Sequence, residues 1–352
     1  MTDLTQWHTW REIHAQPAIW TQFGAEVLAQ RDALRAWIAA SGATEVWFSG
    51  AGTSAYIGDF IAAALATTSD LLLKSVASTD LVSAPHQFLG AAKPLVVSFG
   101  RSGNSAESIG VLNVLDALCP NAPRLNITCN AQSALATRPA VNQKTIVLPD
   151  ATHDQGFAMT SSYTTMLLTA LTIFDPDPPA DVFASLAAGL TDRLVGFATL
   201  ATEMALPDRM VVTGSGALRY TAREAALKIM ELTAGQTPVL WDSALGFRHG
   251  PKSFIAPNTH VLCLISNDPA IARYDRDLAA ELRVQFAGIT VTEIEPTTVS
   301  DTWGAVVQAA AAQVIAAVLS ARMGLNVDDP FVGQGTLTRV VEGVTLYPPA
   351  AS

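Results

Sequence analysis

Uninterrupted apolar segments that end in glycine- or serine-rich turns constrain the fold of this chain more than any other feature. Val46–Phe48 runs into the turn Ser49–Ser54, and Leu95–Ser98 runs into Phe99–Ser105. Leu71–Leu73 has the same apolar character, and we expect it to be a buried strand as well. Further segments of this kind are Arg124–Thr128 and Thr145–Leu148, with a helical pattern following from Thr160 to Phe174. Since apolar and polar positions do not alternate, the pattern predicts an α/β fold of parallel strands covered by helices on both faces.

The opening of this pattern recurs in the second half of the chain. A Gly-x-Gly turn follows an apolar strand at Gly50 and again 164 residues later at Gly214, and His260–Ser266 repeats the strand that ends at Ser98. Two copies of one α/β unit are therefore predicted. The second copy has Asn267–Ala270 where the first has its serine-rich turn, so we expect only the first copy to hold an anion.

The proline-rich segment Asp175–Pro179 is the clearest break in the chain, because prolines and aspartates of this kind mark loops. A helical pattern precedes the first strand, and a stretch rich in glycine and proline ends the chain. Four parts are thus expected, namely an N-terminal helical arm (1–40), a first α/β domain (41–178), a second (179–325) and a C-terminal tail (326–352).

The composition excludes some classes of partner. A net charge of -10 without a basic block argues against binding to nucleic acid or anionic lipid. The N-terminus has no apolar leader segment and no apolar run has the context of a membrane span, so we expect a cytoplasmic protein. Cys119, Cys129 and Cys263 lack metal-ligand spacing and lie in apolar stretches, which predicts buried free thiols. We expect no metal and no cofactor.

Two turns carry the residue types that bind phosphate. Gly52, Thr53 and Ser54 form the first, and Ser102–Ser105 belong to the second. Both lie where a strand passes into a helix, and a helix N-terminus offers unpaired N–H groups and the positive end of a dipole to a ligand. Neither turn matches a Walker A or a dinucleotide-binding fingerprint. The alternative is that the hydroxyls only cap helices, but the presence of two such turns favours a phosphate site.

A charged face is predicted on the helix Thr221–Leu232. Glu224, Lys228 and Glu231 are spaced i, i+4 and i+7, so they share one side of the helix. The loop Gly246–Lys252, with an arginine, a histidine and a lysine, follows shortly afterwards. An ordinary salt-bridged surface is the alternative interpretation. A phosphate site in the first half of the chain favours a chemical role for this face.

Several of these segments resemble a known family. Phe48–Ser54 and Ser98–Ser105 resemble the two loops of the sugar isomerase (SIS) domain. Glu224–Lys228 followed by His249–Pro251 is similar to the second SIS domain in the isomerase half of glucosamine-6-phosphate synthase. From about residue 10 to the C-terminus, the chain resembles more closely the AgaS branch, the galactosamine-6-phosphate deaminase/isomerase family. The runs that carry this closer resemblance are Gly50–Asp59, Phe99–Ser105, His153–Ser162, Gly246–Ser253 and Arg339–Val344. The implied fold is two tandem SIS domains, each a three-layer αβα arrangement.

The resemblance implies an amino-sugar 6-phosphate substrate, with galactosamine 6-phosphate converted to tagatose 6-phosphate and ammonia. The implied catalytic residues are Glu231, which moves a proton between C2 and C1, His249, which opens the sugar ring, and Lys228, which assists Glu231. Glu224 is expected to be scaffold. Residues expected at the phosphate or the sugar are Gly52, Thr53, Ser54, Arg101, Ser102, Asn104, Ser105, Thr160, Ser161 and Arg339, and His153 is a candidate proton relay or a residue paired with Asp154.

One position departs from the synthase pattern. The synthase has a lysine near its C-terminus that forms a Schiff base with the ketose, whereas this chain offers Arg339, which cannot form an imine. A substrate that brings its own C2 amine does not need that lysine, so the departure favours deamination. Glucosamine 6-phosphate deamination, plain ketose/aldose isomerisation and a non-catalytic sugar-phosphate sensor remain the alternatives. The resemblance also implies a homodimer or larger homo-oligomer, in which the histidine can come from a neighbouring subunit.

Overall fold

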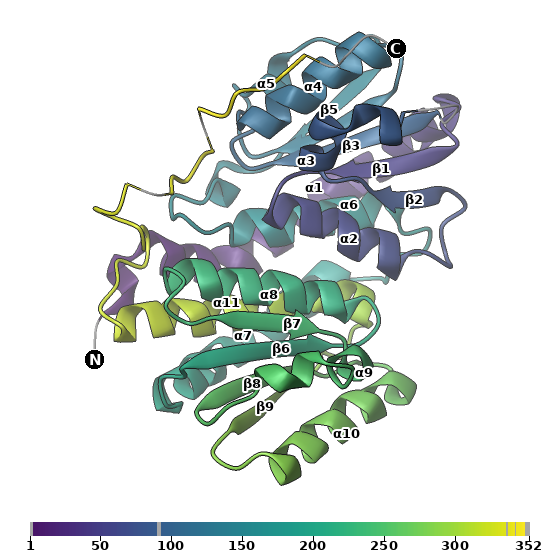
Figure 1. The fold of residues 1–352 in the computed structure, drawn as a ribbon. Helices are drawn as coiled ribbons and strands as arrows, with labels where there is room; N and C mark the ends of the chain where they lie inside the picture. Colours follow the sequence, from purple (N-terminus) through teal and green to yellow (C-terminus); the bar gives the residue numbers. More distant parts are fainter. Residues whose placement is uncertain (1–2, 90–92, 336, 342, 349–352) are drawn as a thin grey trace. The chain divides into compact units, whose positions relative to one another are not determined.

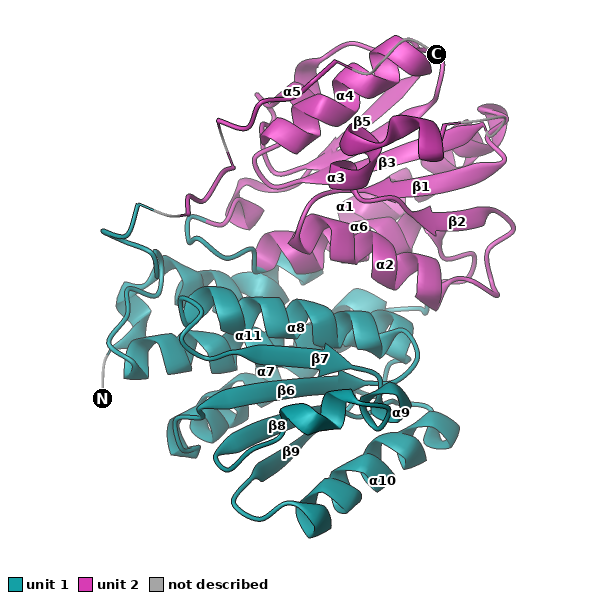
Figure 2. Cartoon of the chain, viewed as in Figure 1, with its two compact units in different colours: residues 1–21, 155–160, 179–336 teal, residues 22–154, 161–178, 337–352 magenta. Residues whose placement is uncertain are grey.

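The computed structural model of the chain describes residues 3–89, 93–335, 337–341 and 343–348. It divides into two compact units (Figure 2). Unit 1 comprises residues 1–21, 155–160 and 179–336, and unit 2 comprises residues 22–154, 161–178 and 337–352. Relative to the domains expected from the sequence, residues 22–40 lie in unit 2 and residues 155–160 in unit 1. Glu342, which belongs to the C-terminal run quoted above, lies outside the described residues.

Unit 2 is built on a five-stranded parallel sheet with the strand order β2-β1-β3-β4-β5. Its strands are β1 (Glu45–Ser49), β2 (Leu72–Ser75), β3 (Pro94–Gly100), β4 (Arg124–Thr128) and β5 (Gln143–Val147). Its helices are the second part of α1 (His8–Ala40), then α2 (Thr53–Ala64), α3 (Ser78–Ser83), α4 (Ala106–Leu118), α5 (Ala134–Thr137) and α6 (Ser161–Phe174), with short 3-10 turns at Pro85–Gln87 and Asp150–Thr152. Helices α1, α2 and α6 cover one face of the sheet, and α3 and α4 cover the other (Figure 1).

The centre of this sheet is the core of unit 2. Strands β1, β3 and β4 are buried at every position. On one face Trp47 packs in a cluster with Val111. On the other face Phe48 meets Phe174 edge-on, with ring centroids 5.1 Å apart. Burial of both faces explains why these strands are continuous apolar runs, since alternation appears only where one face is solvated.

Two expectations about burial are wrong in detail. Leu72 lies 59% exposed, although the run Leu71–Leu73 predicts a buried strand. Strand β2 is at the edge of the sheet, so only one side of it has a neighbouring strand. Cys119 is only half-buried because it lies at the C-terminal cap of α4, where the helix meets solvent. The other two thiols are buried, and all three cysteines are free.

Unit 1 repeats the arrangement with a four-stranded parallel sheet in the order β7-β6-β8-β9. Its strands are β6 (Arg209–Gly214), β7 (Val239–Asp242), β8 (Thr259–Leu264) and β9 (Thr290–Ile294). Its helices are the first part of α1, then α7 (Val182–Glu203), α8 (Leu218–Leu232), α9 (Ala244–Phe247), α10 (Pro269–Gln285) and α11 (Asp301–Arg322), with 3-10 turns at Leu4–Gln6 and Pro251–Phe254. Helices α7, α8 and α11 lie on one side of the sheet, and α9 and α10 lie on the other (Figure 1). The predicted fold class of two parallel α/β sheets covered by helices is confirmed.

Helix α11 is the main apolar element of unit 1. In the part of the chain that the structure describes, α7 and α11 are long and apolar enough to cross a membrane by length and composition alone. The apolar window of α11 is entirely buried within the protein, which is the behaviour of a core helix. Part of the high apolar content of the chain is therefore used inside unit 1.

Candidate active site

The first predicted phosphate turn lies between β1 and α2 in unit 2. Gly52 has a φ of 54°, a left-handed conformation that favours glycine. A Cβ on Gly50 would lie 2.6 Å from the backbone carbonyl carbon of Ser54, so no side chain fits there. Thr53 and Ser54 begin α2 and are buried. The sequence Gly-x-Gly thus brings the backbone close to the first turn of α2, at the positive end of the helix dipole.

Buried hydroxyls without partners lie at the same edge of this sheet. Ser49 and Ser98 are opposite each other in the β1–β3 register, and Ser78 begins α3. Among the described residues, none of the three hydroxyls has a hydrogen-bond partner, although all three side chains are buried. Because a buried polar atom without a partner is costly, these serines mark a place where water or a ligand is expected.

The second predicted turn, between β3 and α4, is stabilised largely by its own side chains. Ser105 is the N-cap of α4 and accepts a hydrogen bond from the amide of Ser108 at 3.3 Å. The side-chain oxygen of Asn104 accepts from the amide of Ala134 at 2.8 Å, which fixes the start of α5. The hydroxyl of Ser102 accepts from the Asn104 amide at 3.3 Å. Capping, the alternative interpretation of this turn, therefore describes part of what these residues do.

Ser161 and Asp154 form the N-terminus of α6. The fully buried carboxylate of Asp154 accepts hydrogen bonds from the amides of Ser161 and Ser162 at 3.1 and 3.0 Å, and both serine hydroxyls donate to it at 2.5 Å. Both donors of Ser161 are thus used by Asp154. Sequence reasoning missed this role of Asp154, because the carboxylate lies seven residues before the helix that it caps and no local capping motif announces it. Thr160 belongs to unit 1, where its carbonyl accepts from Gln313 at 3.3 Å.

Two arginines connect the second turn of unit 2 with the C-terminal segment. Arg101, only 7% exposed, donates to the carbonyl of Arg339 at 2.9 Å, and Arg339 in turn donates to the carbonyl of Asp154. His153 lies next to this pair. Partial burial, followed by the positive charges of Arg339 and Arg101, lowers the pKa of His153 below its usual range. At neutral pH this imidazole is therefore neutral, as a proton acceptor must be.

The charged face of α8 lies in unit 1 and centres on a buried lysine. Lys228 is 1% exposed, and its Nζ lies 2.5 Å from Oε2 of Glu231 and 3.5 Å from Oε1 of Glu224. Glu224 is equally buried, whereas 22% of the Glu231 side chain is exposed. Only Glu231 therefore presents a carboxylate that solvent or a substrate can reach, with an ammonium group holding it in place.

His249 lies on the connection between α9 and the 3-10 turn Pro251–Phe254 in the same unit. Its amide donates to the carbonyl of Gly246 at 2.9 Å, and the next residue, Gly250, has a φ of 121°. The side chain is exposed, and its imidazole has no hydrogen-bond partner among the described residues. An exposed imidazole without a partner is available to exchange protons with a ligand.

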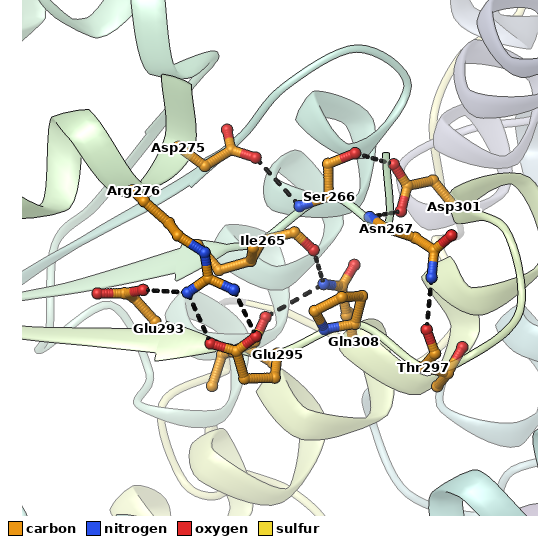
Figure 3. A network of polar contacts seen from close by, with 12 residues as sticks. Ile265, Ser266, Asn267, Asp275, Arg276, Glu293, Glu295, Thr297, Asp301 and Gln308 are labelled. Carbon is orange, nitrogen blue, oxygen red and sulfur yellow. Dashed lines mark hydrogen bonds and ion pairs between the residues drawn. The ribbon is translucent and has the colours of Figure 1, made fainter. Parts of the chain in front are cut away.

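The turns of unit 1 that correspond to the two phosphate turns are filled by carboxylates (Figure 3). Ser215, after β6, donates to Asp275 at 2.5 Å, and the amide of Ser266, after β8, donates to the same carboxylate at 3.1 Å. Asp301 accepts from the hydroxyl of Ser266 and, at 2.6 Å, from the amide of Asn267. Burial raises the pKa of both carboxyls. These donors are satisfied from within the chain, which agrees with the expectation that only the first copy holds an anion.

In the described part of the chain, no group of three or more His, Cys, Asp or Glu residues is placed so that it could hold a metal ion. In unit 1 the structure brings together Glu224, Lys228 and Glu231. In unit 2 it links Arg101 to Arg339 and, through Asp154, Arg339 to Ser161, with His153 beside the two arginines.

Comparison with known proteins gives this arrangement a family. A family model for the SIS domain matches residues 41–174. D-galactosamine-6-phosphate deaminase AgaS from Escherichia coli is 38% identical over 371 residues, which cover 97% of this chain and 96% of that protein. The protein of the same name from Shewanella sp. (strain ANA-3) is 36% identical over 366 residues, covering 99% and 94%. The crystal structure of tagatose-6-phosphate ketose/aldose isomerase from Escherichia coli has a TM-score of 0.89 and 34% identity, covering 100% of this chain and 99% of that chain. Similarity of this extent and along the whole length shows that the chain belongs to the AgaS family of SIS-domain proteins.

Proposed function

We propose that this protein is a deaminating aldose–ketose isomerase that converts D-galactosamine 6-phosphate to tagatose 6-phosphate and ammonia. The relatives that this chain matches along nearly their full length are named D-galactosamine-6-phosphate deaminase and tagatose-6-phosphate ketose/aldose isomerase. The observation that carries the proposal is the pairing of the accessible Glu231 with the buried Lys228, because isomerisation requires a carboxylate that is held in place yet reachable.

The phosphate of the substrate binds at the two turns of unit 2. Gly52 and Ser54 lie at the start of α2, and Ser102 and Ser105 lie at the start of α4. Helix N-termini favour an anion even where no lysine or arginine is free to pair with it. This mode of binding suits a protein whose net charge is -10, because the attraction is local.

The proton transfers belong to His249 and Glu231. His249 moves a proton to the ring oxygen of the sugar, which frees C1 as an aldehyde. Glu231 then removes the proton from C2 and returns it to C1, while Lys228 offsets the negative charge that develops on oxygen. The product is a ketose imine at C2. Water adds to this imine and ammonia leaves, so that the C2 nitrogen of the substrate is the only nitrogen released.

Arg339 fits deamination better than synthesis. Its guanidinium is bound to the Asp154 carbonyl and its own carbonyl is bound by Arg101, so its role is to hold the C-terminal segment beside the second turn. No imine-forming lysine is needed when the substrate supplies the amine. A plain ketose/aldose isomerase would use the same proton transfers, and the relative with that name keeps this second candidate in view.

An ammonia-release assay tests the proposal. The purified protein is given galactosamine 6-phosphate, glucosamine 6-phosphate, their N-acetylated forms and tagatose 6-phosphate. We expect ammonia from galactosamine 6-phosphate first, and none from the N-acetylated sugars. Release from neither free amine would remove the deaminase assignment, and aldose formation from tagatose 6-phosphate alone would favour the plain isomerase.

A matched pair of variants tests the base. Glu231→Gln keeps the shape of the side chain but cannot accept the C2 proton, so turnover falls by about a thousand-fold or more while phosphate binding persists. Glu293→Gln is the control, because Glu293 lies in the same unit, is 20% exposed against 22% for Glu231, and also pairs with cations. Equal activity of the two variants would show that the base is another residue.

The surroundings of the enzyme follow from the same proposal. Free thiols at three positions suit a reducing, cytoplasmic compartment. The expected partners are the small-molecule substrate and further copies of the chain, in a homodimer or a larger homo-oligomer. Light scattering of the purified protein checks the copy number, and a monomer that retains full activity would contradict the assembly.

A further inference from the structure

Two cations flank His249 in the sequence, and both bind one carboxylate on α10. Nε of Arg248 lies 2.7 Å from Oε2 of Glu281, and Nζ of Lys252 contacts Oε1 of the same residue. Lys252 also donates to Oε1 of Gln285 at 2.9 Å. Each carboxylate oxygen of Glu281 thus takes one cation, one from each side of the histidine.

The same face of α10 holds the apolar base of this loop. Leu278 and Leu282 are fully buried in one cluster with Phe247, the last residue of α9. Leu278, Glu281, Leu282 and Gln285 follow the spacing i, i+3, i+4 and i+7, so they share one side of the helix. The loop is therefore packed on α10 through Phe247 and tied to it through the two ion pairs.

We propose that Glu281 is a positioning residue that fixes the backbone of the His249 loop, and this inference rests on the proposed function of His249. The imidazole has no anchor of its own among the described residues, so its location depends on the backbone at Arg248 and Gly250. Gly250, with a φ of 121°, has no side chain that could restrain the backbone at this point. The Glu281 carboxylate binds Arg248 before Gly250 and Lys252 after it, and so restrains the backbone on both sides of this glycine.

The charges make the contact durable near neutral pH. Hydrogen bonds from Lys252 and Arg248 lower the pKa of Glu281 below its usual range, so the carboxylate is ionised throughout the working range of such an enzyme. The three side chains are between 20% and 26% exposed, which screens the pairs and makes them a modest source of overall stability. Losing them is expected to loosen the loop without unfolding unit 1.

Glu293 offers a matched control in the same unit. It also takes two cations, Arg276 and Arg283, each at 2.7 Å, and it is 20% exposed against 25% for Glu281. Figure 3 shows the pair of Glu293 with Arg276. Glu293 lies on the edge strand β9 and, among the described residues, makes no hydrogen bond or ion pair with the His249 loop. Glu281→Ala and Glu293→Ala therefore remove equivalent two-cation sites, of which only one borders the histidine.

Steady-state kinetics with the amino-sugar phosphate are the first measurement. Glu281→Ala should lower kcat by on the order of ten-fold with KM changed less than about two-fold, because a displaced proton carrier slows chemistry more than it weakens phosphate binding. Glu293→Ala should keep kcat within about two-fold of the parent. Glu281→Gln, which retains the shape and one acceptor, should fall between the two. Equal kcat values for the Glu281 and Glu293 variants would overturn the proposal.

A double-variant cycle separates positioning from general damage. In the His249→Asn background, where the proton carrier is already gone, Glu281→Ala should cost less than about two-fold, because residues that act through one another are not additive. A full further loss in that background would mean that Glu281 acts elsewhere, and would also overturn the proposal.

Hydrogen exchange keeps the test independent of the chemistry. Amides in peptides covering residues 244–256 should exchange faster in Glu281→Ala than in the parent, and in Glu293→Ala their exchange rates should equal those of the parent. If the parent protein releases no ammonia at all, the proposed function fails while this measurement still decides whether Glu281 holds the loop. Unchanged exchange in Glu281→Ala would refute the anchoring itself.

Discussion

Acidification should destabilise unit 1 through one buried histidine. His260, on β8, is 3% exposed, and its Nε2 lies 2.9 Å from Oγ1 of Thr292. Burial lowers the pKa of His260 from 6.5 to about 4. Below pH 6.5 the unfolded chain binds a proton at this residue, whereas the folded chain does so only below about pH 4. Stability is therefore present above the unfolded pKa and is lost as the pH falls through this window.

The size of the effect follows from the difference between the two pKa values. One pKa unit corresponds to about 1.4 kcal/mol, so a difference of roughly 2.5 units limits the total loss to about 3 kcal/mol. Between pH 7.5 and pH 5, the loss from this residue should be about 2 kcal/mol. His260→Gln keeps a side chain able to reach Thr292 but removes the titration, and its stability should lack this part of the pH dependence.

Hydrogen exchange of the β8 peptides at pH 7.5 and 5, corrected for the intrinsic exchange rate, gives the opening free energy in both proteins. The comparison between parent and His260→Gln cancels the buried carboxyls Asp275 and Asp301. Their raised pKa values act in the opposite sense, because a carboxyl with a raised folded pKa gains stability as the pH falls. The same pH dependence in parent and variant would refute the assignment of the effect to His260.

Three further perturbations follow from the structure. Gly50→Ala should destabilise unit 2 and weaken the stabilisation of the protein by inorganic phosphate in a thermal shift assay, because a Cβ at this position lies 2.6 Å from the backbone of Ser54. The control is Gly196→Ala, in open space on α7, which should raise stability by up to about 1 kcal/mol. Equal outcomes for the two variants would contradict the tight turn. Asp154→Asn should lower the free energy of unfolding by about 2–5 kcal/mol, because the four hydrogen bonds at the start of α6 lose their charged acceptor. Urea unfolding measures this change, and a loss below about 1 kcal/mol would show that the cap is dispensable. Mixing the inactive Glu231→Gln and His249→Asn proteins under conditions of subunit exchange should restore up to about a quarter of the parent activity if the site is shared between subunits, and none if each chain holds both residues.

The sequence predicts most of the sheet architecture because the strands are buried on both faces and therefore read as continuous apolar runs. Strand β1 and helix α6 begin and end within one or two residues of their expected positions. The predicted burial of Leu72 is wrong because an apolar run at the edge of a sheet has the same composition as one at its centre, and only the strand order distinguishes the two. Strands β7 and β9 of unit 1 are also edge strands with half-exposed residues, and the sequence analysis predicted neither of them. The apolar run of β7 is only three residues long, Val239–Trp241, and β9 mixes polar and apolar residues.

The chemistry-bearing residues divide in the same way. Lys228 and Glu231 are predictable together because a helix brings i and i+3 side chains to one face without any help from the rest of the fold. Asp154 and Glu281 were not predictable as supports, because their partners are seven and about thirty residues away and the contacts exist only after the chain has packed. Local periodicity identifies groups on one element, whereas groups that support them from another element require the structure.

The corresponding turns of the two copies differ in what their donors bind. In unit 2 the turns after β1 and β3 lead into helix N-termini, and the hydroxyls of Ser49 and Ser98 at or near the ends of these strands have no hydrogen-bond partner among the described residues. In unit 1 the donors after β6 and β8 are satisfied by Asp275 and Asp301, and the burial of these carboxyls makes the arrangement self-contained. A phosphate there would have to displace two carboxylates and then face their charge, so we expect no phosphate site at these turns of unit 1. What unit 1 contributes instead is the α8 face, whose buried lysine keeps one reachable glutamate in position. In the proposed function, phosphate binding belongs to the turns of unit 2 and proton transfer to α8 of unit 1, and the internal carboxylates Asp275 and Asp301 are the physical difference between the corresponding turns of the two copies.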